Sequence, residues 1–83
     1  MTQILAYILM EIEIGRTDEV LQELRKIEEA TKISVTTGEY DVVMLLEVPT
    51  LESLYDITVK RIHVIPGIKE TTTAVVEKII TNT

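Results

Sequence analysis

The chain has 83 residues, of which 46% are hydrophobic and 27% charged, and its formal net charge is −6 at pH 7. This composition excludes a disordered chain and a membrane span, and the negative charge disfavours direct binding to nucleic acid. The absence of cysteine excludes disulfides and thiol catalysis. We therefore expect a single soluble domain over residues 1–83. The first apolar run has no basic residue before it and no small-residue cleavage pattern after it, so a signal peptide is not expected and we expect a cytoplasmic location.

The first part of the chain predicts a strand, a helix and a second strand. Apolar residues at every even position from 4 to 14 predict a strand with one wholly apolar face. After Gly15, either Thr17 or Asp18 is expected to cap a helix. The apolar stripe of that helix consists of Val20, Leu21, Leu24 and Ile27. Alternation with β-branched residues over positions 32–37 then predicts a strand that is exposed on one face.

A turn at Gly38–Asp41 leads into the expected centre of the sheet. The segment Val42–Val48 is apolar at every position except Glu47, which is typical of a strand covered on both faces. Pro49 ends this strand, because proline cannot donate a hydrogen bond to a neighbouring strand.

The last part of the chain predicts a helix and a final strand. Thr50 is expected to cap the helix, which should run to about His63. Its predicted buried face consists of Leu51, Leu54, Tyr55, Thr58 and Ile62. The final strand is predicted from Ile68 to about Val76, and a weaker pattern extends it towards Ile80.

The order strand–helix–strand–strand–helix–strand is typical of the α+β ferredoxin-like fold, a four-stranded antiparallel sheet with two helices on one face. The first and third strands carry apolar residues on the other face as well, among them Leu5, Leu9, Val43 and Leu45. A monomer rarely exposes a contiguous apolar patch of this size. We therefore expect two sheets to pack face to face in a symmetric homodimer, as in proteins of the dimeric α/β-barrel type.

The sequence contains few residues suited to catalysis or to metal binding. His63 is the only histidine, and a place at the end of a helix suits it by interaction with the helix dipole. The acidic pair Glu11 and Glu13 is better explained as solvated, and Asp18 with Glu19 as ordinary first-turn residues. The three glycines stand alone and the two serines have no neighbouring base. We expect no catalytic residue, no metal and no cofactor.

Two segments concentrate groups suited to a small molecule: the hairpin turn and a run of three threonines in the last strand. Backbone amides near Gly38 suit a carboxylate and Asp41 or Glu39 suits an ammonium group, which together describe an α-amino acid. A purely structural explanation stays open, because glycine and aspartate are common in turns and threonine is common in strands. The candidate effector-binding residues are Thr37, Gly38, Glu39, Tyr40, Asp41, Thr71 and Thr73.

Three short motifs, in this order and spacing, resemble the ligand-binding domain of the Lrp/AsnC transcription regulators. They are Thr37–Asp41 before a hydrophobic strand, Ile65–Ile68 about two dozen residues later, and Thr71 with Thr73. The resemblance covers nearly the whole chain. Full-length members place a helix-turn-helix domain before this one, so the chain is similar to the stand-alone members that lack it.

The resemblance implies an amino-acid-sensing regulatory domain that self-assembles and has no DNA-binding part of its own. It implies sheet-to-sheet dimers, their assembly to an octamer or decamer, and effector sites between dimers that include the hairpin. In such a site the amides near Gly38 are expected to bind the carboxylate, and Asp41 either to bind the ammonium group or to hold the loop. It also implies mixed assembly with a full-length Lrp/AsnC-type regulator.

Three alternatives share the fold. An ACT-type regulatory module also binds amino acids, but its usual glycine follows the first strand, where this chain has Gly15. A small dimeric α/β-barrel enzyme, such as a monooxygenase, needs a polar pocket that often holds His, Asn or Trp, and this chain has no Trp and a single Asn, Asn82. A ligand-free assembly module would keep the same oligomeric state with every amino acid.

Overall fold

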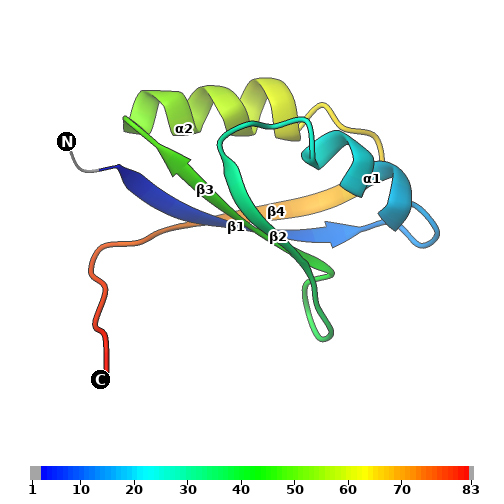
Figure 1. The fold of residues 1–83 in the computed structure, drawn as a ribbon. Helices are drawn as coiled ribbons and strands as arrows, with labels where there is room; N and C mark the ends of the chain where they lie inside the picture. The colour runs from blue at the N-terminus through cyan, green and yellow to red at the C-terminus, as the bar shows by residue number, and fades with distance from the viewer. Residues whose placement is uncertain (1–2, 83) are drawn as a thin grey trace.

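The computed structural model describes residues 3–82, which form one antiparallel sheet with helices on one side of it (Figure 1). The four strands lie in the order β2-β3-β1-β4. Along the chain the elements are β1 (Ile4–Ile12), α1 (Thr17–Leu24), β2 (Ala30–Val35), β3 (Val42–Val48), α2 (Leu51–Ile57), a π-helical turn η1 (Thr58–Ile62) and β4 (Ile68–Val75). The predicted ferredoxin-like fold is therefore confirmed.

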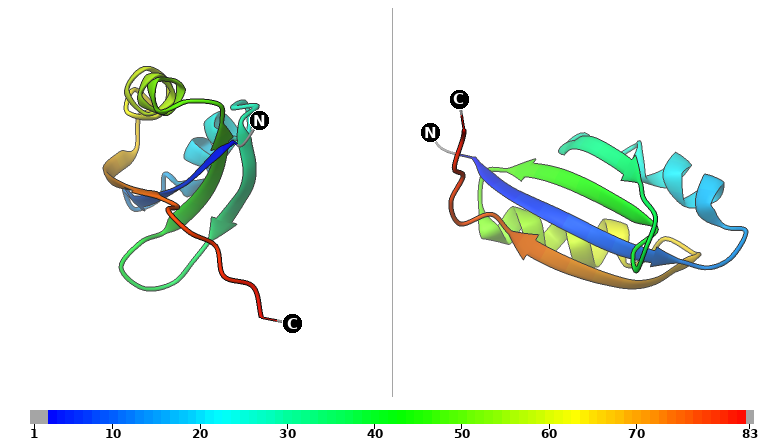
Figure 2. Two further views of the ribbon diagram at one scale, coloured as in Figure 1. Left: turned by 90° about the vertical axis from the view of Figure 1, so that its left-hand side faces the viewer. Right: turned by 90° about the horizontal axis from the view of Figure 1, so that it is seen from below.

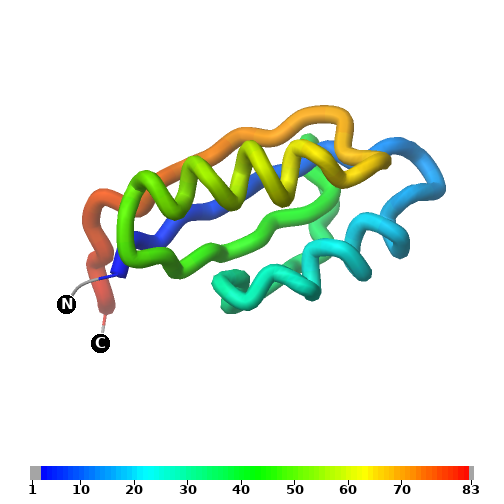
Figure 3. Tube along the Cα trace, turned by 90° about the horizontal axis from the view of Figure 1, so that it is seen from above, coloured from blue at the N-terminus to red at the C-terminus, as the bar shows by residue number. Residues whose placement is uncertain are grey.

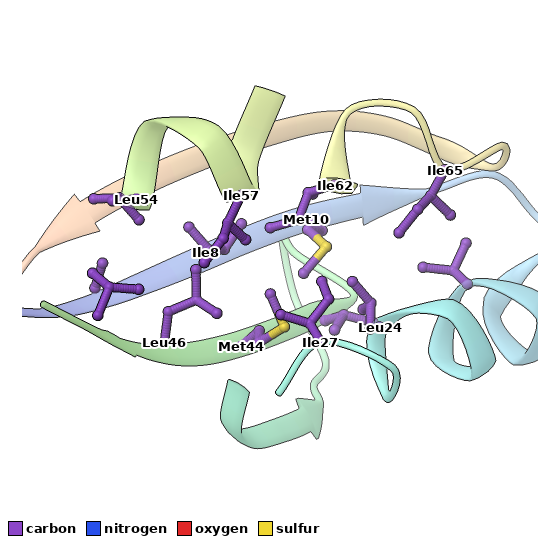
Figure 4. Close-up of a cluster of buried hydrophobic side chains, with 14 of the residues drawn as sticks. Ile8, Met10, Leu24, Ile27, Met44, Leu46, Leu54, Ile57, Ile62 and Ile65 are labelled. Atoms are coloured by element: carbon purple, nitrogen blue, oxygen red, sulfur yellow. The ribbon is translucent and has the colours of Figure 1, made fainter. Parts of the chain in front are cut away.

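The core lies between the helices and the two central strands, β1 and β3. Alternate side chains of these strands point towards the helices and are buried. They are Ala6, Ile8, Met10, Ile12, Val42, Met44, Leu46 and Val48. Figure 4 shows Ile57 and Ile62 of the second helical segment packed over this layer. The even-numbered apolar residues of β1 thus form the buried face that the sequence predicts.

Strand β1 ends at Ile12, two residues earlier than predicted, because the chain turns there. The Glu13 amide donates to the Gly67 carbonyl at 2.8 Å. The Arg16 amide then donates to the Glu13 carbonyl at 3.0 Å. Ile14 lies in this turn and is exposed, so its apolar character does not reflect a place in the sheet.

The two edge strands also differ from the prediction at their ends. Strand β2 spans Ala30–Val35 instead of 32–37, because its pairing with β3 begins two residues earlier. Strand β4 ends at Val75, after which the Val76 amide donates to the Leu5 carbonyl at 2.9 Å. The following residues lead away from the sheet (Figure 1), so the expected extension towards Ile80 does not form.

Helix α1 begins without the predicted side-chain cap. Arg16 occupies the N-cap position, and neither Thr17 nor Asp18 caps the helix. The prediction of a cap at these residues was wrong, because the tight turn before the helix places its start one residue earlier. The helix ends at Leu24, and Ile27 stays buried in the turns that follow.

Helix α2 begins as predicted, with the Thr50 hydroxyl accepting a hydrogen bond from the Ser53 amide at 3.0 Å. It continues into η1, where the His63 amide donates to the Thr58 carbonyl at 2.8 Å, five residues back. The helical segment thus ends at the predicted His63, but its last turn is wider than an α-helical turn.

The predicted buried face of α2 was wrong at two positions. Leu51 and Tyr55 are 60% and 63% exposed, whereas Ile57, absent from the predicted stripe, is buried. Tyr55 lies two residues from Ile57, about 200° around the helix axis, so both cannot face the sheet. Leu54 is buried as expected.

The helices all lie on one face of the sheet, and the other face is uncovered (Figures 2 and 3). We call this uncovered surface the open face. Its apolar residues are Leu5, Tyr7, Leu9, Val43 and Leu45, which are half-buried except for the more exposed Tyr7. Within one chain, therefore, β1 and β3 are covered on the helix side alone, and cover on the second face of β3 stays a prediction that requires a second copy.

Candidate functional site

The predicted hairpin joins β2 to β3 and is closed at its base by hydrogen bonds. The Thr36 amide donates to the Asp41 carbonyl at 2.9 Å, and the Thr36 hydroxyl donates to the Tyr40 carbonyl at 2.8 Å. Gly38 has a φ of +104° and open space where a side chain would begin. A non-glycine residue rarely adopts this conformation, so glycine at position 38 permits the turn.

Asp41 fastens the base of the hairpin to the neighbouring central strand. Its amide donates to the Met10 carbonyl at 2.9 Å, and its Oδ2 accepts a hydrogen bond from the Ile12 amide at 2.8 Å. These two bonds extend the pairing of β3 with β1 past the last paired residues. Asp41 was expected either to bind an ammonium group or to hold the loop. In this structure its side chain holds the loop, through the hydrogen bond from the Ile12 amide.

Tyr40 ties the hairpin to the far edge of the sheet. Its hydroxyl lies 3.3 Å from the hydroxyl oxygen of Thr72 on β4. Thr72 is paired with Leu9, whose side chain belongs to the open face, so Tyr40 reaches across β1 on that face. The hairpin is thus connected to both β1 and β4.

The threonine run is divided between the two faces of the sheet. Thr71 and Thr73 are paired with Met10 and Ile8, which point towards the helices, so they lie on the opposite face from Thr72. Among the threonines of β4, only Thr72 contacts the hairpin in the described structure. The sequence analysis selected the two neighbours, Thr71 and Thr73, and missed Thr72. Alternation along β4 identifies Thr72 once its pairing with β1 is known.

Thr71 has a different partner. Its hydroxyl lies 3.0 Å from Nε2 of His63, which stands at the end of η1. The two residues line a hollow of about 200 Å³ together with Ile68, Lys69 and Glu70. Thr71 and the hairpin therefore belong to separate surfaces, and the predicted effector-binding residues do not form a single site within one chain.

Carboxylates gather beside the hairpin on the open face. Glu11 of β1 is paired with Glu70 of β4. The sequence analysis grouped Glu11 with Glu13, but a carboxylate oxygen of Glu13 lies 3.8 Å from a guanidinium nitrogen of Arg16. Hydrogen bonding to Glu70, reinforced by partial loss of solvation, raises the pKa of Glu11 above its usual value. Lys69 lowers this pKa, whereas Glu39 at the hairpin raises it further. Glu39 is thus close enough to influence the strand pair.

Replacing Glu11 by glutamine is expected to raise the melting temperature slightly at neutral pH. A carboxyl whose pKa is raised by folding favours the protonated form, so its contribution to stability is present at low pH and is lost as the pH rises through that pKa. The variant should therefore be more stable than the wild type in the pH range above the usual pKa of a glutamate, and equally stable below it. Thermal melting across this range, with the exposed Glu28→Gln as the control, measures the difference. Equal pH profiles for the two variants would contradict an effect of Glu70 on the Glu11 carboxyl.

No metal site is evident in the part of the chain described. No group of three His, Asp or Glu side chains within residues 3–82 is placed to hold a metal ion. A hollow of about 410 Å³ lies between α1 and β2, and its lining includes Leu21, Arg25 and Val35, the last of which directly precedes the base of the hairpin. None of the described helices has the length and apolar character that crossing a membrane requires.

Comparison with known families gives a match over nearly the whole chain. The family model described as the Lrp/AsnC ligand binding domain matches residues 5–83. The HTH-type transcriptional regulator FL11 of Pyrococcus abyssi is 36% identical over 74 residues, which cover 89% of this chain and 48% of the regulator. The chain therefore spans about half the length of the curated relatives that it matches.

Solved structures show the same fold. The crystal structure of FFRP-DM1 has 32% sequence identity and a TM-score of 0.84, and the match covers 88% of this chain and 97% of that one. A transcriptional regulator of Neisseria meningitidis, NMB0573, solved as a complex with L-Met, has a TM-score of 0.88 at 18% identity. That match covers 96% of this chain and 53% of the regulator, and at this identity it shows the fold alone.

Proposed function

Because the chain belongs to the Lrp/AsnC ligand-binding domain family, we propose that it is an amino-acid-sensing, self-assembling domain whose effector binds at the β2–β3 hairpin. The observation that supports this proposal is that the base of the hairpin is held in place while backbone amides at its tip donate no hydrogen bond. Asp41 and Tyr40 hold the hairpin to β1 and β4, yet none of the amides of residues 37–40 donates a hydrogen bond within the described chain. Adjacent free amides beside a glycine form a concave site for an anion such as a carboxylate.

An amino acid supplies both charges that this region can accept. The free amides of the hairpin suit its carboxylate, and Glu39, with Glu11 and Glu70 nearby, suits its ammonium group. The complex of the Neisseria meningitidis regulator with L-Met supports an amino acid as the ligand class. We propose Thr37, Gly38 and Glu39 as the contacting residues, with Tyr40 and Asp41 as residues that position the loop.

Thr71 and Thr73 enter the proposal in a different way. They lie on the helix face of an edge strand, away from the hairpin of their own chain. They can therefore contribute to an effector site only if a neighbouring copy brings its hairpin to them. A site shared between dimers fulfils this condition, and it is the arrangement that we propose.

The dimer that we propose packs two open faces against each other. One contiguous surface of apolar side chains on β1 and β3 is uncovered, and a two-fold contact buries it in both copies at once. The hairpin is tied to this same face through Tyr40 and Thr72. An effector that binds the hairpin more tightly in the assembled state than in the single chain would therefore favour assembly.

The curated relatives are transcriptional regulators, which agrees with a regulatory rather than an enzymatic role. We propose that the chain works in the cytoplasm as a regulatory domain of this family. It would influence transcription by assembling with a full-length Lrp/AsnC-type regulator. Purification of such a regulator with and without this chain, in the presence of each amino acid, tests the mixed assembly directly.

The first test of the proposed function is thermal melting with each of the twenty amino acids. A ligand that binds the folded state alone stabilises it by about 2.7 kcal/mol at one hundred times its dissociation constant. We expect a rise in melting temperature that is confined to one chemical group of amino acids and grows with concentration. No shift with any of the twenty at millimolar levels would contradict the sensor proposal and favour a ligand-free assembly module.

A further inference from the structure

The hollow of about 410 Å³ between α1 and β2, which we call the edge pocket, lies at one edge of the sheet (Figure 2). Its volume is within the range of sites that bind small molecules. Its apolar lining consists of Leu21 from α1 and of Ile33 and Val35 from β2. Leu21 and Ile33 pack against the core but are only half-buried, and Val35 is 64% exposed. The edge pocket therefore presents apolar surface that the single chain leaves in contact with water.

Two unpaired charges of opposite sign stand at the two ends of the edge pocket. Asp18 in the first turn of α1 and Arg25 at its C-cap both line it, with Leu21 between them. Seven residues of helix rise by about 10 Å, which separates the two charged residues along the pocket. Neither forms an ion pair or a side-chain hydrogen bond with another described residue, whereas Arg16 and Arg61, the other two arginines, each have a glutamate partner.

Strand β2 adds a free backbone edge to the edge pocket. Within residues 3–82 its only neighbour in the sheet is β3, so alternate amides and carbonyls of β2 point away from the sheet. Ile33 and Val35 are paired with the buried Met44 and Val42, so their side chains lie on the helix face of this edge. An extended peptide can add to such an edge through main-chain hydrogen bonds, while its side chains enter the neighbouring pocket.

The length of the edge pocket and its two charges select a peptide of about three residues. An extended chain spans about 3.3 Å per residue, so three residues cover about the distance from Asp18 to Arg25. The terminal carboxylate suits the Arg25 guanidinium, which can bind it through two hydrogen bonds, and the terminal ammonium group suits Asp18. A single amino acid carries both charges on one carbon atom and cannot reach both ends of the pocket at once.

We propose that the edge pocket binds a short apolar peptide as an added strand beside β2, with its carboxyl end at Arg25 and its amino end at Asp18. An adjoining hollow shares Arg25 with the earlier residues of β2, whereas Val35, the last residue of β2, lines the edge pocket with Asp18. Strand β2 thus runs from the Arg25 end to the Asp18 end, and the peptide would pair with it in the antiparallel direction. This site goes beyond the effector site proposed at the hairpin, to which neither Asp18 nor Arg25 belongs.

Calorimetric titration of the purified full chain with trileucine tests the edge pocket, and NMR of the same complex locates the peptide. We expect the largest changes in the amide signals of residues 18–25 and 30–35. Amidation of the peptide carboxylate and the variant Arg25→Gln are each expected to weaken binding about tenfold, because each removes the same charge-assisted contact. Both changes together should therefore weaken binding little more than either one alone. N-acetylation of the peptide and Asp18→Asn form the corresponding pair at the other end.

The controls separate this site from a general attraction of charges and from the hairpin. Arg61→Gln removes the same charge outside the edge pocket and should leave the affinity for trileucine unchanged. Free leucine, which is too short, should bind at least about tenfold more weakly than trileucine at this site. No binding of trileucine at millimolar concentration, equal binding of its amide, or an unchanged affinity in Arg25→Gln overturns the edge pocket. Amide changes confined to residues 37–40 also overturn it, and leave the effector site at the hairpin standing.

Discussion

Replacing Asp41 by alanine is expected to destabilise the fold and to abolish the response to an amino acid. The Ile12 amide would lose its acceptor at 2.8 Å, and the loss of a hydrogen bond to a carboxylate at a partly buried site costs about 1–3 kcal/mol. The hairpin would also lose its attachment to β1. Chemical denaturation measures the first effect, and thermal melting with and without the effector measures the second.

The matched variant Asp41→Asn distinguishes between the two roles expected of this residue. Its side-chain carbonyl can still accept the hydrogen bond from the Ile12 amide, but it carries no charge for an ammonium group. We expect Asp41→Asn to retain most of the stability and the ligand response, because the structure shows Asp41 holding the loop. Loss of the response in Asp41→Asn, with stability retained, would instead assign the ammonium group to this carboxylate.

Replacing Tyr7 by lysine is expected to convert the proposed sheet dimer to single chains. Tyr7 lies on the central strand β1 in the middle of the open face, between Leu45 of β3 and Ala74 of β4. A two-fold contact would bury two added charges there without partners, and hot-spot substitutions of this kind cost about 2 kcal/mol or more. We therefore expect the dissociation constant of the dimer to rise at least about thirtyfold, as measured by sedimentation equilibrium.

Tyr7 is a suitable position because its side chain is 43% exposed within one chain. Its replacement should therefore leave the fold of the single chain intact. Val64→Lys is the control, since it adds the same charge at an exposed apolar residue outside the open face. An unchanged dimer in Tyr7→Lys, or equal weakening in both variants, would refute a dimer formed through the open face.

The position of the hairpin would give a physical route from the proposed effector site to the proposed dimer contact. Tyr40 contacts Thr72 on the open face, and Asp41 bonds to β1, which contributes Tyr7 and Leu9 to the same face. A ligand that orders the loop therefore acts next to the surface that the dimer would bury. Asp41→Ala and Tyr7→Lys test both ends of this route, since the first disturbs the loop and the second disturbs the open face.

Much of the fold could be predicted from the sequence, because the signals that define it are local. The alternation in β1 identified its buried face, the apolar run of Val42–Val48 matched β3 at both ends, and Thr50 caps α2 as expected. The order of these elements then restricts the fold to the ferredoxin-like arrangement. The hairpin at Gly38–Asp41 was also predictable, because glycine and aspartate have specific roles in turns.

What only the tertiary structure decided depends on pairing between segments that are distant in the sequence. Within a run of three threonines in a strand, successive residues face opposite sides. Only the register of β4 with β1 places Thr72 on the side of the hairpin. The same register puts Glu11 opposite Glu70 rather than beside Glu13. The pairing at the end of β1 brings the Ile12 amide to Asp41 and thereby gives that carboxylate a structural partner. Local patterns determine which residues share a face, whereas long-range pairing determines what each face meets.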